Sequence, residues 1–142
     1  AVVTITRGRD AHLHRQRVGL ADDPPDRHVV VGMGARPELA DVPGAPPVTV
    51  LEVGVPESGL PLAAARNAGA AAADADLLVF LDVDCIPAPG MLRRYADAAR
   101  RVDGPALLCG PVSYLPPAPD GGYPADGLAA LAPPHPARPA PP

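Results

Sequence analysis

The sequence is poor in aromatic side chains and in positive charge. Aromatic residues make up 3% of the 142 residues, and the chain has no tryptophan. Its core must therefore be built from valine, leucine, isoleucine and alanine. Lysine and arginine together number 12 against 16 acidic residues, which gives a net charge of −4. This balance offers no broad positive surface for a phosphate backbone and argues against a nucleic-acid-binding protein.

Long apolar runs and leader-like segments are also lacking. No apolar stretch approaches the ~20 residues that a membrane-spanning helix needs. Residues 1–5 indicate a strand and lack the basic start and cleavage site of a signal peptide. Cys85 and Cys109 each end an apolar run, so we expect two buried thiols, with a disulfide or a metal pair as the alternatives. The expectation is a cytoplasmic protein without a transmembrane segment.

Proline is abundant, and it divides the chain. There are 22 prolines and 14 glycines, and the prolines crowd into the region after residue 115. Proline cannot continue a helix or an interior strand. We therefore expect an α/β domain over residues 1–115 and a Pro/Gly-rich loop or disordered tail over residues 116–142. Within that tail, Leu128–Leu131 could form one helical turn.

Hydrophobic patterning in the first 115 residues predicts alternating strands and helices. Strands are expected at residues 2–6, 28–31, 48–53 and 77–81, with an interrupted extended segment at 106–115. Helices are expected at residues 10–21, capped by Asp10, at 62–73, and from about 89 to 101. This order indicates an α/β fold with a mostly parallel sheet. Residues 77–81 are apolar throughout, which is typical of a central strand covered on both faces.

Two aspartates directly follow this apolar run. Strand alternation would place Asp82 and Asp84 on one side with Val83 opposite, at the strand end where α/β proteins bind ligands. Two carboxylates so placed repel each other unless a cation or a proton lies between them. Mg²⁺ or Mn²⁺, which prefer oxygen ligands, would relieve the repulsion and could bridge to phosphate. The segment therefore predicts a metal-assisted site, with helix capping and solvation as the alternative.

Polar residues at two further places could meet an anionic ligand. Thr6, Arg7 and Arg9 follow the first strand and could bind a diphosphate or a base, or be solvated loop residues. Arg66 and Asn67 interrupt the alanine-rich helix, where Arg66 could face an anion or lie on an ordinary exposed surface. The histidines show no metal-ligand spacing and are expected on the surface: His12, His14, His28 and His135.

In combination, these motifs resemble the inverting glycosyltransferases of family 2, which have the GT-A fold. The similarity spans roughly residues 2–115. It is carried by Thr-Ile-Thr-Arg-Gly-Arg at 4–9, Leu-Ala-Ala-Ala-Arg-Asn-Ala-Gly at 62–69, and Phe-Leu-Asp-Val-Asp at 80–84 followed by Ile-Pro. The resemblance implies a Rossmann-like nucleotide-diphospho-sugar transferase fold, incomplete in this chain, which would be the donor-binding half.

The resemblance also implies roles for the residues. Asp84 would be the direct ligand of Mn²⁺ or Mg²⁺, and Asp82 would contact the ribose or help to hold the metal. The segment Thr6–Arg9 occupies the place of the family's first nucleotide-binding loop, and Arg66 with Asn67 would face the nucleotide. The implied reaction transfers a sugar, with inversion, from a nucleoside diphosphate sugar to a hydroxyl of an unidentified glycan, lipid or small molecule.

The sequence departs from the family pattern in two places. Gly32-Met33 replaces the acidic pair that follows the second strand, which leaves the nucleotide open. No residue after Leu115 matches the family's Glu-Asp pair, so the catalytic base is unassigned. The alternatives are a non-catalytic or vestigial nucleotide-sugar-binding module and a haloacid-dehalogenase-like phosphatase. The phosphatase is disfavoured because Ile86 stands where that motif carries threonine.

Overall fold

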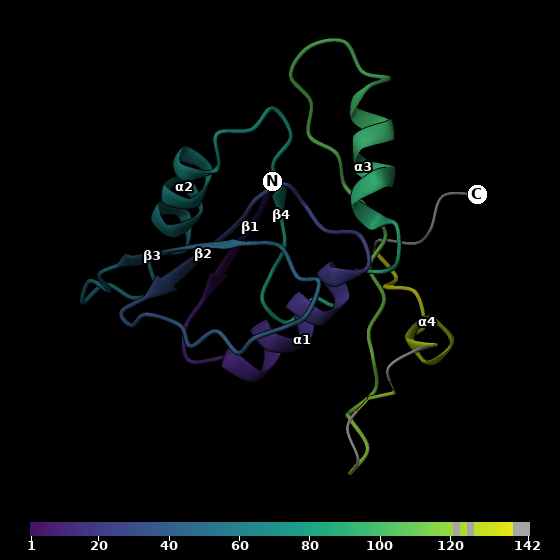
Figure 1. Ribbon diagram of the computed structural model, residues 1–142, viewed down its shortest axis with the longest axis horizontal. Coiled ribbons are helices and arrows are strands. Elements are labelled where there is room, and N and C mark those ends of the chain that lie inside the picture. Colours follow the sequence, from purple (N-terminus) through teal and green to yellow (C-terminus); the bar gives the residue numbers. More distant parts are fainter. Residues whose placement is uncertain (121–122, 125–126, 138–142) are drawn as a thin grey trace. The chain divides into compact units, whose positions relative to one another are not determined.

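The computed structural model describes residues 1–120, 123–124 and 127–137 (Figure 1). The chain divides into two compact units, Ala1–Arg101 and Val102–Pro142. The first unit contains the sheet and the helices that cover it. The domain boundary predicted at residue 115 stays a prediction, and part of the predicted tail lies outside the described residues.

A single sheet organises the first unit. Its four strands run parallel in the order β3-β2-β1-β4, which confirms the predicted α/β class. The strands are β1 (Val2–Thr6), β2 (His28–Met33), β3 (Val48–Val53) and β4 (Val79–Phe80). The helices are α1 (Asp10–Ala21), α2 (Leu62–Ala73) and α3 (Met91–Ala99). Asp10 is the first residue of α1 and Arg9 takes the cap position, so the predicted cap was one residue late.

Strands β1 and β2 form the centre of the sheet, and every residue in them is buried. Alternate side chains point to opposite faces. On one face Val3, Ile5 and Val31 pack with the alanines of α2. On the other face Val30 packs with Leu13 of α1. Figure 1 shows α2 on one side of the sheet and α1 on the other.

Small residues allow α2 to lie directly on the sheet. Its buried positions are Ala65, Gly69 and Ala73, which recur every four residues and so form one face. A Cβ atom added at Gly69 would lie 2.4 Å from Cγ1 of Val3, so this crossing has no room even for a methyl group. The small side chains of this segment therefore bring α2 into close contact with the sheet.

The prediction of a central strand at residues 77–81 is wrong. Strand β4 has two residues, Val79 and Phe80, and pairs with β1 alone, so it is an edge strand of the described sheet. Phe80 is accordingly 49% exposed. The N–H of Leu81 still donates to the Val3 carbonyl at 3.1 Å, after which the chain turns. An apolar run indicates a strand, but it does not reveal how many neighbours that strand has.

The extended segment predicted at residues 106–115 is also not a strand. In the described part of the second unit, one isolated antiparallel bridge joins Ser113 to Pro134, and α4 (Leu128–Leu131) is the predicted short turn of helix. Without a neighbouring strand to cover it, Cys109 is exposed, contrary to the expectation of a buried thiol. Cys85 is half-buried, and both thiols are free. Among the described residues, no helix has the length and apolar character to cross a membrane.

Candidate functional site

The two predicted aspartates lie on a tight turn at the carboxyl end of β4. The N–H of Cys85 donates to the carbonyl of Asp82 at 2.8 Å, which closes the turn. Val83 points inward and packs against Leu13, whereas Asp82 and Asp84 are exposed. The predicted arrangement of two outward carboxylates with Val83 opposite is therefore present. A turn produces it, because the strand has already ended at Phe80.

Each of these carboxylates is paired with an arginine from a different element. Nη2 of Arg66, in α2, lies 2.8 Å from Oδ1 of Asp82. Nη1 of Arg9, in the loop between β1 and α1, lies 3.4 Å from Oδ2 of Asp84. The side chains of Arg9, Asp82 and Asp84 are more than half exposed and that of Arg66 is 37% exposed, so each pair contributes only about 0–1 kcal/mol to stability. The pairs matter more for charge, because the guanidinium groups relieve the repulsion that two adjacent carboxylates would otherwise have.

The structure separates the remaining predicted site residues from this cluster of Arg9, Arg66, Asp82 and Asp84. Thr6 ends β1 and is 2% exposed, and its hydroxyl has no hydrogen-bond partner among the described residues. Arg7 and Asn67 are exposed. Within the described residues, no ion pair or hydrogen bond joins either of them to the cluster. Their predicted contacts with a nucleotide stay predictions.

Sequence reasoning missed a buried polar group beneath the turn. Nε2 of Gln16, in α1, donates to the carbonyls of Asp82 at 2.8 Å and Cys85 at 3.2 Å, and Oε1 of Gln16 accepts from the Thr4 hydroxyl at 2.7 Å. One signal could have found it. Gln16 falls between Leu13 and Leu20 on the inward stripe of α1, where a polar side chain needs a partner.

His28 completes this group and corrects a second expectation. It was predicted at the surface, but it is fully buried, with Nε2 3.2 Å from the Thr4 hydroxyl oxygen. Burial, and secondarily the positive charge of Arg17, lowers the pKa of His28 from 6.5 to about 4. His28 is the first residue of β2, and its side chain faces α1 rather than solvent. A histidine at the start of a strand therefore does not by itself indicate exposure.

The thiol of Cys85 lies beside the acidic turn. Burial raises its pKa, and the negative charges of Asp84 and Asp82 raise it further. A thiol in this environment is protonated at neutral pH and is a poor nucleophile. We therefore assign no covalent role to Cys85.

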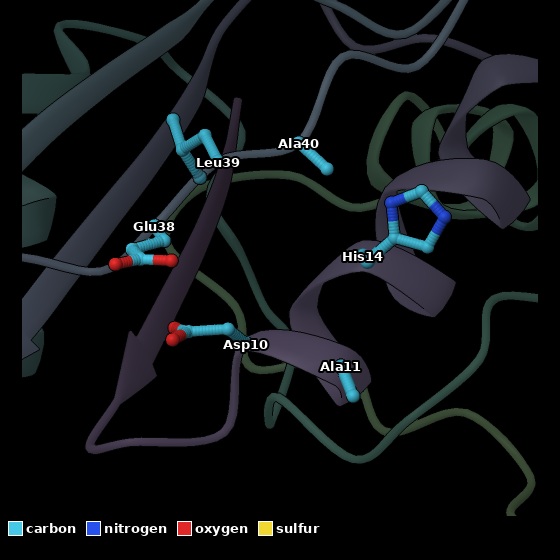
Figure 2. A pocket seen from close by; sticks show the side chains of 6 residues that line it. All are labelled: Asp10, Ala11, His14, Glu38, Leu39 and Ala40. Atoms are coloured by element: carbon cyan, nitrogen blue, oxygen red, sulfur yellow. The ribbon is translucent and has the colours of Figure 1, made fainter.

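A separate cavity of about 390 Å³ lies between the first half of α1 and the loop after β2. Figure 2 shows the carboxylates of Asp10 and Glu38 on the same side of this cavity and the His14 ring on the other. Neither carboxylate has an ion pair with a described residue, and two unpaired carboxylates disfavour a diphosphate. The arginine-flanked turn is thus the better place for an anionic ligand.

The departure at Gly32 has a steric reason. A Cβ atom there would lie 2.1 Å from the Ala35 carbonyl oxygen and 2.8 Å from Cδ of Pro37. The loop that follows β2 folds back over this position. No acidic side chain could occupy it without moving that loop.

The donor set at the turn suits a divalent cation that is shared with a ligand. Within the part of the chain that the structure describes, no cluster of three or more His, Cys, Asp or Glu side chains could hold a metal. Asp82 and Asp84 alone supply two carboxylates. Mg²⁺ is commonly bound in this way, by one or two carboxylates together with phosphate oxygens of the substrate. The residues present fit that mode and do not form an all-protein cage.

The fold and the turn together define an α/β protein whose charged site lies at the carboxyl ends of parallel strands, where such sheets bind ligands. Comparison with known families then gives a specific assignment: residues 54–115 match glycosyl transferase family 2. This match confirms the predicted resemblance over that segment. It favours a glycosyltransferase over the phosphatase alternative. No curated protein and no solved structure shows a significant match to the chain.

The matched segment contains Arg66, Asn67, Asp82 and Asp84. It begins after β3, so the loop Thr6–Arg9 lies outside it although the resemblance was expected to start at residue 2. The structure nevertheless brings Arg9 to Asp84. Folding thus joins one residue from outside the matched segment to the acidic turn inside it.

Proposed function

We propose that this chain binds a nucleoside diphosphate sugar at the acidic turn and acts in a metal-assisted, inverting transfer of the sugar to an acceptor hydroxyl. The observation that carries the proposal is the pairing of Asp82 with Arg66 and of Asp84 with Arg9 at the carboxyl edge of the sheet. The family match over residues 54–115 supports the class of reaction.

Asp84 and Asp82 are the residues that would hold Mn²⁺ or Mg²⁺. When bound, such a cation neutralises charge on the leaving nucleoside diphosphate. In the transfer, the acceptor oxygen forms a bond to the anomeric carbon while the bond from that carbon to the diphosphate oxygen breaks. The acceptor proton passes to a base, for which we assign no residue.

Arg9 and Arg66 would change partners when the donor binds. In the structure their guanidinium groups neutralise the two carboxylates. Carboxylates that hold a divalent cation no longer need them, and guanidinium groups match phosphate oxygens well. Metal and diphosphate should therefore strengthen each other's binding, and this coupling is reciprocal.

Calorimetric titration of the chain with UDP, GDP, CDP and ADP, each with and without Mn²⁺, tests the proposal. We expect at least one diphosphate to bind, and to bind at least about fivefold more tightly with Mn²⁺, the lower end of typical coupling. Equal diphosphate affinity with and without Mn²⁺ would refute the proposed role of the metal. Absence of binding by all four would refute the assignment of a donor site.

Replacing Arg66 by alanine should affect metal and nucleotide in opposite directions. Asp82 loses its competing cation, so Mn²⁺ alone should bind more tightly to Arg66→Ala than to the native chain. The diphosphate loses a charge-assisted hydrogen bond and should bind about tenfold more weakly. Electron paramagnetic resonance of free Mn²⁺ measures the first effect, and calorimetry measures the second.

Arg93→Ala is the control, because it removes another arginine that faces an aspartate, here Asp23 at 4.0 Å. Both affinities should stay at the native value in this variant. A decrease in Mn²⁺ affinity in Arg66→Ala would contradict the proposed exchange of partners.

A further inference from the structure

A continuous series of hydrogen bonds runs along the α1 side of the sheet, from His28 at the amino end of β2 to the acidic turn that follows β4. It passes from His28 to Thr4 of β1, from Thr4 to Gln16 of α1, and from Gln16 to the backbone of the turn. His28, Thr4 and Gln16 are each fully buried. The series therefore connects three separate elements through the interior, out of contact with water.

The carbonyl oxygens of Asp82 and Cys85, at one end of this series, determine the direction of every hydrogen bond in it. Two carbonyl oxygens face Gln16, so its amide NH₂ must point toward them and its Oε1 must point toward Thr4. The single hydroxyl proton of Thr4 is then donated to Gln16. It follows that Thr4 accepts from His28, whose Nε2 carries the proton. No alternative orientation of the amide satisfies both carbonyls.

Gln16 holds both ends of the turn. Its two acceptors belong to Asp82, where the turn begins, and to Cys85, where it closes. Apart from the packing of Val83 against Leu13, the turn has weak anchors, because β4 has ended at Phe80 and the arginine partners of its carboxylates are only partly buried. Breaking a buried hydrogen bond costs more free energy than breaking an exposed ion pair. The backbone that carries Asp82 and Asp84 is thus fixed mainly from below.

We infer that Gln16 is a positioning residue for the two carboxylates, and that Thr4 and His28 hold its amide in the productive orientation. This inference rests on the proposed function, because it concerns how the turn presents its carboxylates to a metal and a diphosphate. Gln16 does not touch the ligand. It acts through the backbone of Asp82 and Cys85, as supporting residues act on ligating side chains at metal sites.

The experiment compares Gln16→Met with Leu20→Ala in the full chain. Methionine keeps the volume of Gln16 but cannot donate to the two carbonyls, whereas Leu20→Ala weakens packing elsewhere on α1 against Val2 and Val79. Gln16→Met should bind the diphosphate with Mn²⁺ about tenfold more weakly. Leu20→Ala should lower the melting temperature and leave that affinity at the native value. Equal affinity losses in the two variants would overturn the inference.

A second pair of variants, at Thr4, separates hydrogen bonding from packing. Thr4→Ser keeps the hydroxyl and loses a methyl group, and Thr4→Val keeps the shape and loses the hydroxyl. A positioning role predicts near-native affinity for Thr4→Ser and weakened affinity for Thr4→Val, whereas a packing role predicts the reverse order. This pair also decides the matter if Gln16→Met fails to fold.

Hydrogen exchange of the Cys85 amide provides a readout that needs no ligand. Its N–H closes the turn onto Asp82, so Gln16→Met should speed exchange at Cys85 more than at core amides such as that of Val30. If Gln16→Met loses protection at Cys85 selectively but the native chain binds no diphosphate, the positioning role of Gln16 is supported and the proposed function is refuted. If the native chain binds the diphosphate and Gln16→Met leaves both the protection of Cys85 and the affinity unchanged, only the positioning role of Gln16 is refuted.

Discussion

Replacing Asp84 by asparagine is expected to abolish the strengthening of diphosphate binding by Mn²⁺. The two side chains have the same shape, but asparagine carries no charge and is a much poorer ligand for a hard divalent cation. Because Asp84 is exposed and its ion pair with Arg9 spans 3.4 Å, the free energy of unfolding should change by less than about 1 kcal/mol. Calorimetry with and without Mn²⁺ measures the first quantity, and urea denaturation measures the second.

Asp74→Asn is the matched control for Asp84→Asn. Asp74 is also exposed and also lies 3.4 Å from an arginine, Arg27, so the two substitutions remove the same charge from equivalent surface pairs. Asp74 has a φ of 44°, a left-handed conformation that asparagine adopts readily, so the control should fold normally. It should keep the full Mn²⁺ effect. If Asp84→Asn kept that effect too, Asp84 would not be a metal ligand.

The sequence predicted the sheet well because its central strands carry a strong local signal. The β-branched runs at Val2–Thr6 and at residues 29–31 are buried on both faces, and buried parallel strands need that composition. The second strand continues to Met33, two residues beyond the predicted end. The helix ends at Ala21 and Ala73 were also as predicted. These features depend on neighbouring residues in the chain.

The errors in the fold concern contacts between distant residues. The apolar run at residues 77–81 gave no information on whether one or two strands would flank it, and β4 lies at an edge of the described sheet. Residues 106–115 have the composition of a strand, but among the described residues they have no partner to pair with beyond one isolated bridge. A strand forms only beside a second strand, and the local sequence does not show which distant segment will supply it.

The sequence predicted the charged residues of the candidate site but not the buried polar residues that hold the turn. Asp82 and Asp84 stand out because they directly follow an apolar run, and Arg66 stands out among alanines. Gln16 and His28 carry no such contrast, and their importance follows only from the register that places them beside Thr4. The pairing of Arg9 with Asp84 likewise joins residues far apart in the sequence.

The second large effect is expected in stability at mildly acidic pH. The pKa of His28 falls from 6.5 to about 4 on folding, so between these values the unfolded chain binds a proton that the folded chain does not. The contribution of His28 to stability is therefore fully present above about pH 6.5 and is lost as the pH falls toward 4. At about 1.4 kcal/mol per pKa unit, the loss approaches about 3 kcal/mol.

The His28→Gln variant isolates this contribution from the titration of carboxylates. Glutamine is neutral at every pH and can still donate to Thr4, so its free energy of unfolding should fall less than that of the native chain between pH 6.5 and 4. Urea denaturation across this pH range gives the comparison, and identical curves for His28→Gln and the native chain would contradict the prediction.

The environment of Nδ1 explains why protonation of His28 destabilises the folded chain. Nε2 is committed to Thr4, so the proton must go to Nδ1, which is buried without a hydrogen-bond partner among the described residues. Charging the ring there places an unpaired cation near Arg17. The protonated ring can still donate from Nε2, so acid should weaken the fold around His28 before it reverses any hydrogen bond that leads to the acidic turn. Protection of the Cys85 amide should accordingly persist at pH 5 while overall stability has already fallen.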